Sequence, residues 1–362
     1  MPSALLPLLL VACDGEPEPT PVGSCATGAT PTIDIEGAVA GTRSAQTAYT
    51  VPWTGEAREL AVHTWYATDD AEGTGARWLD LFDDANSWVD AGYAPPEEGC
   101  LAPLVVYSHG SQAWAGNGSP VIRQLVNAGW VAAAPDHTDN LLTQNQDPKP
   151  ESFPLLRALD VTATIDWIEG LPEDDPLHGR VDTSRVLLFG HSYGGQTSWI
   201  HGGPTFDPAL IAARCEGSAV GCTPEEEAAF ADPVADPRIV AVGPLDGSLG
   251  TDLVADAGWA TLDRPVLYMT GSGGEGEAAA FARASTGDVT WVDLLGACHE
   301  SFTDSPVDCE VEKTHGLMIT ATYVANFGTH TVLDSDDADV LAVLDGTTVV
   351  SDIVVMTRSR AD

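Results

Sequence analysis

The pentapeptide GHSYG at residues 190–194 contains the residue types needed for nucleophilic catalysis. It follows the apolar run VLLF and precedes a helical segment, which matches the G-x-S-x-G nucleophile elbow. In such an elbow, the serine occupies a strained turn and flanking glycines let strand and helix approach closely. A serine in an ordinary strand–helix turn would not explain the consecutive Gly194-Gly195. The pattern predicts that Ser192 is a nucleophile.

A serine hydroxyl needs a general base, and in this elbow architecture the histidine follows the nucleophile in the chain. Four histidines do so. His299 stands directly after the strand-like segment VTWVDLLGA, where a loop at the carboxyl edge of a sheet begins, so we predict that it is the base. We expect His201 to be a packing or pocket residue. We expect His315 and His330 to have solvated or capping roles in the terminal helical region.

The base needs a carboxylate that holds its ring in the right tautomer. Asp246 ends the strand-like RIVAVGPLD, and Glu275 follows the next strand-like segment in a glycine-rich loop. Both positions lie at carboxyl ends of strands, where α/β sheets bind ligands. The sequence favours Asp246 and leaves Glu275 as the alternative.

Acyl transfer also requires donors for a developing oxyanion, and backbone N–H groups serve well because they are preorganised. We expect one from Tyr193, the residue after the nucleophile, and one from Ser111, after the strand-like LVVYSHG. His109 precedes the nucleophile, and we expect it to brace this loop through a hydrogen bond. Trp114 and Trp199 are candidates for lining the substrate pocket.

These residues require a scaffold that brings strand ends together. From about residue 50, strand-like and helix-like segments alternate, and runs such as LVVY, VLLF and IVAV lack polar alternation. This pattern predicts an α/β fold with a doubly wound, mostly parallel sheet covered on both faces. We expect one domain over residues 46–330, with a lid-like insertion at 204–238. Residues 331–362 are either its final segment or a tail.

The first thirteen residues form a short apolar run that ends in LVAC, the form of a bacterial lipoprotein processing box. The run is too short to span a membrane, and it predicts a signal peptide with Cys13 as the lipid anchor. The alternatives are a plain secretion signal and no signal at all, because basic residues before the run are missing. Residues 14–45 are expected to form a flexible tether.

With Cys13 set aside for lipid, six of the seven cysteines remain, and an even number fits an oxidising compartment. Closeness in sequence suggests the pairs Cys25–Cys100, Cys215–Cys222 and Cys298–Cys309. We expect no metal and no organic cofactor, because the cysteine and histidine spacings suggest no metal site. The acid cluster at 334–339 is interpreted as a solvated loop or helix start.

The net charge of −39 arises from 54 acidic and 15 basic residues. It would repel phosphate backbones and anionic headgroups over most of the surface, so the charge argues against a nucleic-acid partner. An acidic surface suits a secreted protein or a salty habitat, and it also serves solubility without any specific partner.

The chain resembles α/β-hydrolases of the group that contains platelet-activating factor acetylhydrolases and dienelactone-hydrolase-like esterases. The resemblance runs through most of residues 55–327 and includes PLVVYSHGS, RALDVTATIDWI, VDTSRVLLFGHSYGG, VAVGPLDG and LLGACHESFTD. It implies Asp246 as the acid, His299 as the base and Ser111 and Tyr193 as oxyanion donors.

The sequence also departs from this group. Dienelactone hydrolases proper use a cysteine nucleophile, so Ser192 argues against their substrate. Many bacterial relatives place the acid one strand later in a Gly-x-x-Asp loop, which reads GSGGE here and ends at Glu275. The insertion has no obvious counterpart in the group.

These features together predict hydrolysis of carboxylic esters through an acyl-enzyme. Neutral small-molecule, lipid or polymer esters suit the acidic surface better than anionic substrates. An acyltransferase or peptidase would use the same triad, and a surface binding module without catalysis is the third reading.

Overall fold

The computed structural model describes residues 23–232, 234–271 and 275–360. Cys13 and the rest of the predicted signal peptide lie outside these residues. No helix among the described residues has the length and apolar character needed to cross a bilayer.

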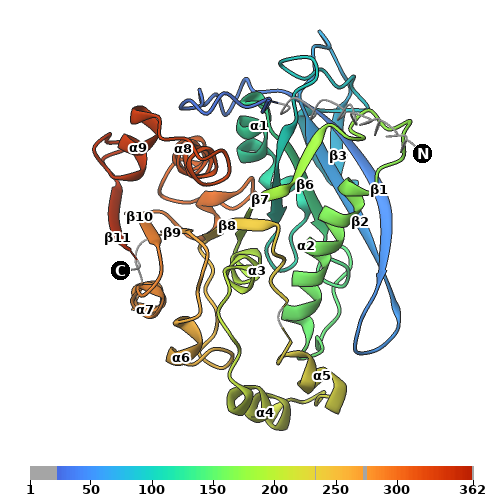
Figure 1. Ribbon diagram of the computed structural model, residues 1–362, viewed down its shortest axis with the longest axis vertical. Helices are drawn as coiled ribbons and strands as arrows, with labels where there is room; N and C mark the ends of the chain where they lie inside the picture. The colour runs from blue at the N-terminus through green and yellow to red at the C-terminus, as the bar shows by residue number, and fades with distance from the viewer. Residues whose placement is uncertain (1–22, 233, 272–274, 361–362) are drawn as a thin grey trace, which may run out of the picture.

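Within the described residues, the strands form one sheet of eleven, with the order β11-β10-β9-β8-β7-β5-β6-β2-β1-β4-β3 (Figure 1). Strands β6, β5, β7, β8, β9 and β10 are parallel neighbours, whereas β2 and β11 join them in antiparallel fashion. The strands are β1 (Ala40–Thr50), β2 (Ala57–Tyr66), β3 (Gly75–Trp78), β4 (Phe82–Val89), β5 (Ala102–Ser108), β6 (Val131–Asp136), β7 (Val181–His191), β8 (Ile239–Leu245), β9 (Val266–Gly271), β10 (Val289–Leu294) and β11 (Val354–Ser359).

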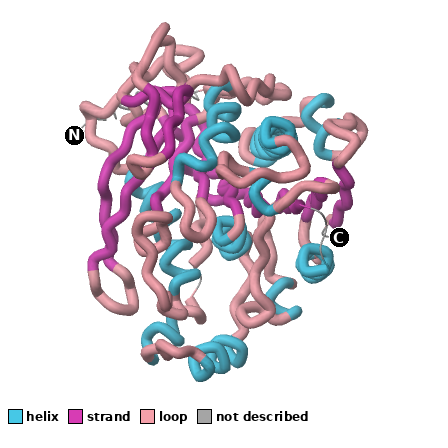
Figure 2. Tube along the Cα trace, turned by 180° about the vertical axis from the view of Figure 1, so that it is seen from behind, coloured by secondary structure: helices cyan, strands magenta, loops and turns pink. Residues whose placement is uncertain are grey.

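Helices cover both faces of this sheet, and Figure 2 shows the strands running between them. One apolar layer contains residues of α1 and α8, and the other contains residues of α2 and α3. The helices are α1 (Ser119–Asn127), α2 (Phe153–Glu169), α3 (Tyr193–His201), α4 (Pro208–Gly217), α5 (Pro224–Ala229), α6 (Asp256–Trp259), α7 (Glu275–Ala284), α8 (Lys313–Thr331) and α9 (Ala338–Leu344), with short 3₁₀ turns at η1 (Ala115–Gly118) and η2 (His299–Phe302).

The central strands are buried along their length, as the unbroken apolar runs predicted. Every residue of β5 and β6 is buried, because helices cover both faces there. Strand β1 instead alternates between half-buried and exposed residues after Thr42, since it belongs to a hairpin near one edge. The predicted doubly wound α/β sheet is therefore confirmed, with an antiparallel extension at each end.

The switch point of the sheet lies at β5. The crossover through α1 leads to β6 on one side of β5, and the crossover through α2 leads to β7 on the other side. Loops that leave β5 and β7 therefore diverge above the sheet, and such a crevice is where doubly wound sheets bind ligands.

The packed domain begins earlier than the sequence suggested. The Cys25 backbone N–H donates to Leu101 O at 2.9 Å, and Cys25 is bonded to Cys100. Strand β1 starts at Ala40, so the expected boundary between residues 45 and 46 falls inside a strand. The disulfide and the strand pairing hold the described part of the expected tether against the domain. At the other end, β11 completes the sheet by pairing with β10.

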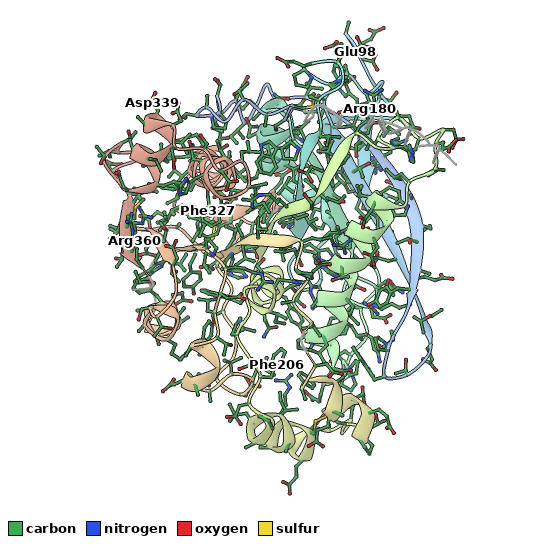
Figure 3. All side chains as sticks on the ribbon, in the orientation of Figure 1. Glu98, Arg180, Phe206, Phe327, Asp339 and Arg360 are labelled. Carbon is green, nitrogen blue, oxygen red and sulfur yellow. A yellow bond between two sulfur atoms is a disulfide. The ribbon has the colours of Figure 1, made fainter. Side chains whose placement is uncertain are left out.

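The segment at 204–238 contains α4 and α5 between α3 and β8. Its small core includes the edge-to-face pair of Phe206 and Phe230, whose ring centroids are 5.2 Å apart, and Figure 3 labels Phe206 beside α4. The Cys215–Cys222 disulfide closes the loop that joins the two helices. All three disulfides join the cysteines that sequence proximity suggested.

Candidate active site

Ser192 occupies a strained turn between β7 and α3. Its backbone angles are φ 56° and ψ −115°, an unusual combination for a residue that carries a side chain. The Ser192 N–H donates to Leu245 O at 2.8 Å, so neighbouring strand β8 holds the turn. The side chain is half-buried at the carboxyl end of the sheet. This is the geometry of a nucleophile elbow.

The glycines around Ser192 are required by close backbone contacts. A Cβ atom on Gly194 would lie 1.8 Å from Ser108 O, and one on Gly190 would lie 2.5 Å from Gly194 O. A Cβ atom on Gly247 would lie 2.0 Å from Ser192 O. No side chain fits at these distances, so the helix and strands can approach only because these residues are glycines.

Asp246 lies directly after β8 and points its carboxylate toward the end of β9. Its backbone φ is 45°, a conformation that aspartate tolerates better than most residues. Its Oδ1 accepts a hydrogen bond from Gly271 N at 2.8 Å, and its Oδ2 lies 2.5 Å from His299 Nδ1. The backbone N–H of Gly271 therefore fixes the carboxylate, and the second oxygen remains for the imidazole.

His299 is the first residue of η2, in the loop after β10. The adjacent Cys298–Cys309 disulfide ties this loop together, and Cys298 N donates to Ser301 Oγ at 3.0 Å. Because Asp246 accepts from Nδ1–H, the other ring nitrogen, Nε2, carries the free lone pair. A base in this tautomer can take a proton from a hydroxyl.

The surroundings of His299 favour its protonated form. Its pKa is raised above the usual 6.5, first because of the hydrogen bond to Asp246 and further because of the negative charges of Asp246 and Glu300. Burial acts in the opposite direction and is only partial, because 47% of the His299 side chain is exposed. The ring therefore can accept a proton and remain stabilised by the carboxylate.

His191 contacts His299, the predicted base. No role for His191 was predicted from the sequence, although this residue lies inside the elbow motif. Its Nε2–H donates to His299 O at 2.7 Å, and the two ring centroids are 4.5 Å apart. Burial and the neighbouring His299 lower the pKa of His191 to about 4. A neutral His191 thus holds the loop that carries His299 close to the residue before Ser192.

The hydroxyl of Ser192 makes no hydrogen bond within the described part of the chain, and neither does His299 Nε2. The contact between the two rings nonetheless places His299 beside the residue that precedes Ser192. Hydrogen bonds between nucleophile and base are often long without substrate and tighten in the complex.

The loop after β5 approaches the elbow. A Cβ atom on Gly110 would lie 3.2 Å from the Cβ atom of Ser192, so glycine gives this loop close access. Ser111 follows Gly110, and its hydroxyl donates to Asn140 Oδ1 at 3.1 Å. Tyr193 is the first residue of α3, where a backbone N–H has no partner within the helix. The two predicted oxyanion donors thus belong to segments that flank Ser192.

His109 braces this loop, as the sequence suggested. Its Nδ1–H donates to Gly110 O at 2.7 Å, while its Nε2 accepts from His137 N at 2.9 Å. Burial holds the pKa of His109 well below the usual range, so the ring stays neutral. His109 has no free ring nitrogen for base chemistry.

The two predicted pocket tryptophans lie in different surroundings. Trp199 is fully buried between Trp259 and Tyr268, and its Nε1–H donates to Gly247 O at 3.0 Å, so it is a core residue and the pocket assignment was wrong. The position of Trp199 on α3 directs its side chain into the apolar core between the helix and the sheet. Trp114 stacks on Phe82 and lines a cavity of about 260 Å³, but Ser192, Asp246 and His299 are not among the residues that line it, so its role in a substrate pocket stays a prediction.

The remaining histidines are held by other contacts. His201 is fully buried, with Nε2 3.2 Å from Ala158 O and Nδ1 accepting from Asp236 N at 3.1 Å, which fits a packing role. His330 Nδ1 lies 2.8 Å from Ser335 O at the end of α8. Glu275, the alternative acid, starts α7.

Structural comparison supports the fold assignment. A ferulic acid esterase from Streptomyces cinnamoneus superimposes with a TM-score of 0.60 and 20% sequence identity, covering 89% of this chain and 97% of that chain. At the level of sequence, the chain matches neither a protein-family model nor a curated protein. The chain has an α/β-hydrolase fold.

Proposed function

We propose that this protein is a serine hydrolase that cleaves carboxylic esters through an acyl-enzyme. The observation that carries the proposal is the 2.5 Å contact between His299 Nδ1 and Asp246 Oδ2 beside a strained Ser192. An oriented imidazole and a serine hydroxyl at a strand–helix turn are the groups that acyl transfer uses. The superimposable protein is itself named an esterase.

Acylation begins when Ser192 Oγ attacks the ester carbonyl carbon and His299 Nε2 takes the hydroxyl proton. The carbonyl oxygen becomes an oxyanion, which the N–H groups of Ser111 and Tyr193 receive. Asp246 stabilises the imidazolium without taking its proton. As the carbon–oxygen bond to the alcohol breaks, the imidazolium returns the proton to the leaving oxygen.

Deacylation repeats these steps with water. His299 Nε2 takes a proton from water as it attacks the acyl carbon, and the tetrahedral intermediate collapses to release the acid and restore Ser192. This sequence needs no group beyond those of the chain. An alcohol or amine that replaces water would make the protein an acyltransferase, and an amide substrate would make it a peptidase.

The net charge of the protein and the structurally similar esterase together suggest a substrate class. A net charge of −39 disfavours anionic substrates at long range, so we propose neutral esters of small molecules, lipids or polymers. The superimposable protein is a ferulic acid esterase, so esters of ferulic acid and related hydroxycinnamic acids are one class to include in the test.

A panel of p-nitrophenyl esters of graded acyl length, together with methyl hydroxycinnamates, tests the proposal. We expect turnover by the wild type and its loss in Ser192→Ala. Added alcohol or amine should leave the acid as the main product. Acyl transfer to the added nucleophile would support the transferase, and hydrolysis that survives in Ser192→Ala would refute the mechanism. A wild type without turnover or active-site labelling would support a binding module.

We also propose that the protein is exported. Its disulfides fit an oxidising compartment, and the predicted lipid anchor Cys13 precedes the described residues. Cys13→Ala should move the protein from the membrane fraction to the soluble fraction. An unchanged membrane fraction would contradict lipid anchoring.

A further inference from the structure

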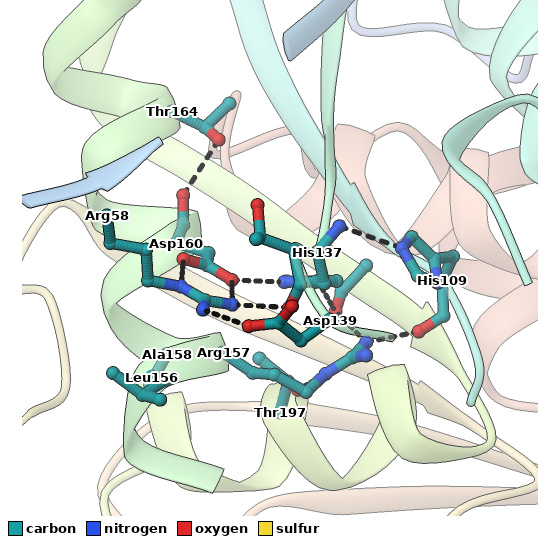
Figure 4. A network of polar contacts seen from close by, with 12 residues as sticks. Arg58, His109, His137, Asp139, Leu156, Arg157, Ala158, Asp160, Thr164 and Thr197 are labelled. Atoms are coloured by element: carbon teal, nitrogen blue, oxygen red, sulfur yellow. Dashed lines mark hydrogen bonds and ion pairs between the residues drawn. The ribbon is translucent and has the colours of Figure 1, made fainter. Parts of the chain in front are cut away.

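Helix α2 carries a buried cation, Arg157, that contacts no carboxylate of the described residues. Arg157 is fully buried, and among the described residues no Asp or Glu lies within ion-pair distance of its guanidinium. Asp160, one turn later, is already paired with Arg58 and His137, as Figure 4 shows. Burying a charge without a direct partner costs free energy, so the position calls for a reason.

The first contacts of Arg157 are with the loop after β5. Its Nη2 donates to the carbonyl oxygen of His109 and to Ser108 Oγ, the latter at 3.2 Å. His109 stands two positions before Ser111 and, through Nδ1, also holds Gly110 O. The guanidinium therefore fixes the backbone that presents the proposed Ser111 donor.

The other contacts of Arg157 are with the start of α3. Its Nε donates to Thr197 Oγ1 at 3.2 Å, and this hydroxyl donates in turn to Tyr193 O at 3.1 Å. The guanidinium carbon also lies 4.7 Å from the centroid of the Tyr193 ring, within the range of a cation–π contact. One side chain thus touches both segments that flank Ser192.

The rest of the network makes this arrangement rigid. Ser108 Oγ lies 2.9 Å from His137 Nε2, and His137 Nδ1 lies 2.9 Å from Asp160 Oδ2. Because Asp160 can only accept, His137 donates from Nδ1 and accepts from the Ser108 hydroxyl, which itself accepts from Arg157. The donor and the acceptor of each hydrogen bond are therefore fixed, and the bonds from Arg157 to the Asp160 carboxylate can form in only one arrangement.

The charge of Arg157 persists in this position. Burial lowers its pKa to about 10, and the negative charge of Asp160 acts in the opposite direction. The guanidinium is therefore protonated at neutral pH. One of its nitrogens, Nη1, is buried without a hydrogen-bond partner among the described residues, so the structure tolerates an unsatisfied donor to keep this side chain in place.

We propose that Arg157 is a positioning residue that clamps the two halves of the oxyanion hole, the loop bearing Ser111 and the first turn of α3 bearing Tyr193. The inference rests on the proposed function, since it assigns the N–H groups of these residues to the oxyanion. A shift of about 1 Å in such groups is enough to lower a rate by about 100-fold. Arg157 acts through these segments and needs no contact with substrate.

The test compares wild type with Arg157→Lys and Thr197→Val. Lysine keeps the charge near Asp160 but lacks the planar fork that serves three acceptors. Valine keeps the shape of Thr197 and removes only the hydroxyl between Arg157 and Tyr193. The matched control is Thr320→Val, because Thr320 is a fully buried threonine of α8 whose hydroxyl also donates four residues back, to Gly316 O.

Two readouts separate positioning from general damage. The first is the split between kcat and KM for a p-nitrophenyl ester, and the second is the affinity of a trifluoromethyl ketone, whose adduct with Ser192 carries an oxyanion. We expect Arg157→Lys to lower kcat and ketone affinity together by about 100-fold with KM unchanged. Thr197→Val should lower both by a smaller factor, and Thr320→Val should change neither.

Folded variants Arg157→Lys and Thr197→Val with wild-type kcat and ketone affinity would overturn the inference. If Arg157→Lys does not fold, Thr197→Val decides alone, with Thr320→Val as its reference. Equal losses in Thr197→Val and Thr320→Val would also overturn it, because they would show general damage. A wild type that hydrolyses no ester would refute the proposed function itself, which distinguishes the two failures.

Discussion

Two of the imidazole–carboxylate pairs in this molecule make the same kind of contact, from ring Nδ1 to an aspartate Oδ2, in different surroundings. His299 Nδ1 lies 2.5 Å from Asp246 Oδ2, and His137 Nδ1 lies 2.9 Å from Asp160 Oδ2. The pKa of His299 is raised, chiefly by its hydrogen bond, whereas burial lowers the pKa of His137 to about 3. The exposed fraction is 47% for the His299 side chain and 0% for that of His137.

The difference shows that access to water and nearby charge decide what such a pair can do. Burial is the main cause of the low pKa of His137, and the charge of Arg157 is a further cause. A histidine that remains neutral serves as a fixed link between hydrogen bonds. A half-exposed histidine with the same partner can gain and lose a proton during each turnover.

The largest expected effect is the loss of esterase activity on replacing Asp246, which distinguishes this carboxylate from Asp160. Asp246→Asn should lower kcat for a p-nitrophenyl ester by about 10⁴-fold, because the ring would lose its tautomer and its counter-charge. The free energy of unfolding, measured with urea, should change little, since asparagine has nearly the same shape and its Oδ1 can still accept the hydrogen bond from Gly271 N. Retained turnover in this variant would show that Asp246 does not orient the base.

The second expected effect is a loss of stability on replacing Asp160, which again distinguishes Asp160 from Asp246. Asp160→Asn should lower the free energy of unfolding by about 3 to 5 kcal/mol, because buried Arg58 would lose the carboxylate that it contacts at 2.8 Å. Urea denaturation of wild type, Asp160→Asn and Asp246→Asn measures the contrast. Equal stability of the two variants would remove the distinction between a structural and a catalytic pair.

The third effect concerns pH. The base must be neutral to act, so kcat/KM should fall about tenfold per unit as the pH drops below the raised pKa of His299. The inflection should lie above 6.5, and Glu300→Gln should move it to lower pH, because the charge of Glu300 raises this pKa. Measuring kcat/KM against pH for the wild type and for Glu300→Gln checks that the inflection of the variant lies at lower pH. An inflection that does not move would show that another group controls the rate.

The smallest expected effect is on the alternative acid. Glu275→Gln should leave kcat unchanged, since Asp246 already occupies the Nδ1 position of His299. The assay is the same p-nitrophenyl ester hydrolysis, run beside Asp246→Asn. A large loss in Glu275→Gln together with activity in Asp246→Asn would reverse the assignment.

The His299–Asp246 pair could be predicted from sequence because both residues stand at the ends of strand-like segments. Ser192 comes shortly after the apolar run VLLF, Asp246 directly follows VAVGPL, and His299 follows the strand-like VTWVDLLGAC. Parallel strands bring such ends to one edge of a sheet, so order along the chain is enough to suggest that these side chains meet. The three disulfides could be predicted for a simpler reason, because each of them joins a cysteine to the next cysteine along the chain.

The buried pair could not be predicted in the same way. Arg157 and Asp160 lie in a helix whose other residues are largely apolar, and charged residues in a helix are usually taken to face solvent. Only the packing of α2 against the loop after β5 shows that these charges are buried. The sequence signal for this network was the presence of Arg157 and Asp160, two charged residues, within an otherwise apolar stretch of helix. Trp199 was misassigned because helix rotation, which the sequence does not reveal, points it into the core.

The most direct test of the account is active-site labelling. A fluorophosphonate probe followed by peptide mapping should modify Ser192 in the wild type and should react far more slowly with His299→Gln, which keeps the serine but lacks the base. Labelling of Ser192 that depends on His299 is the predicted result. A wild type that remains unlabelled, or that is labelled at another residue while Ser192 stays free, would contradict the account.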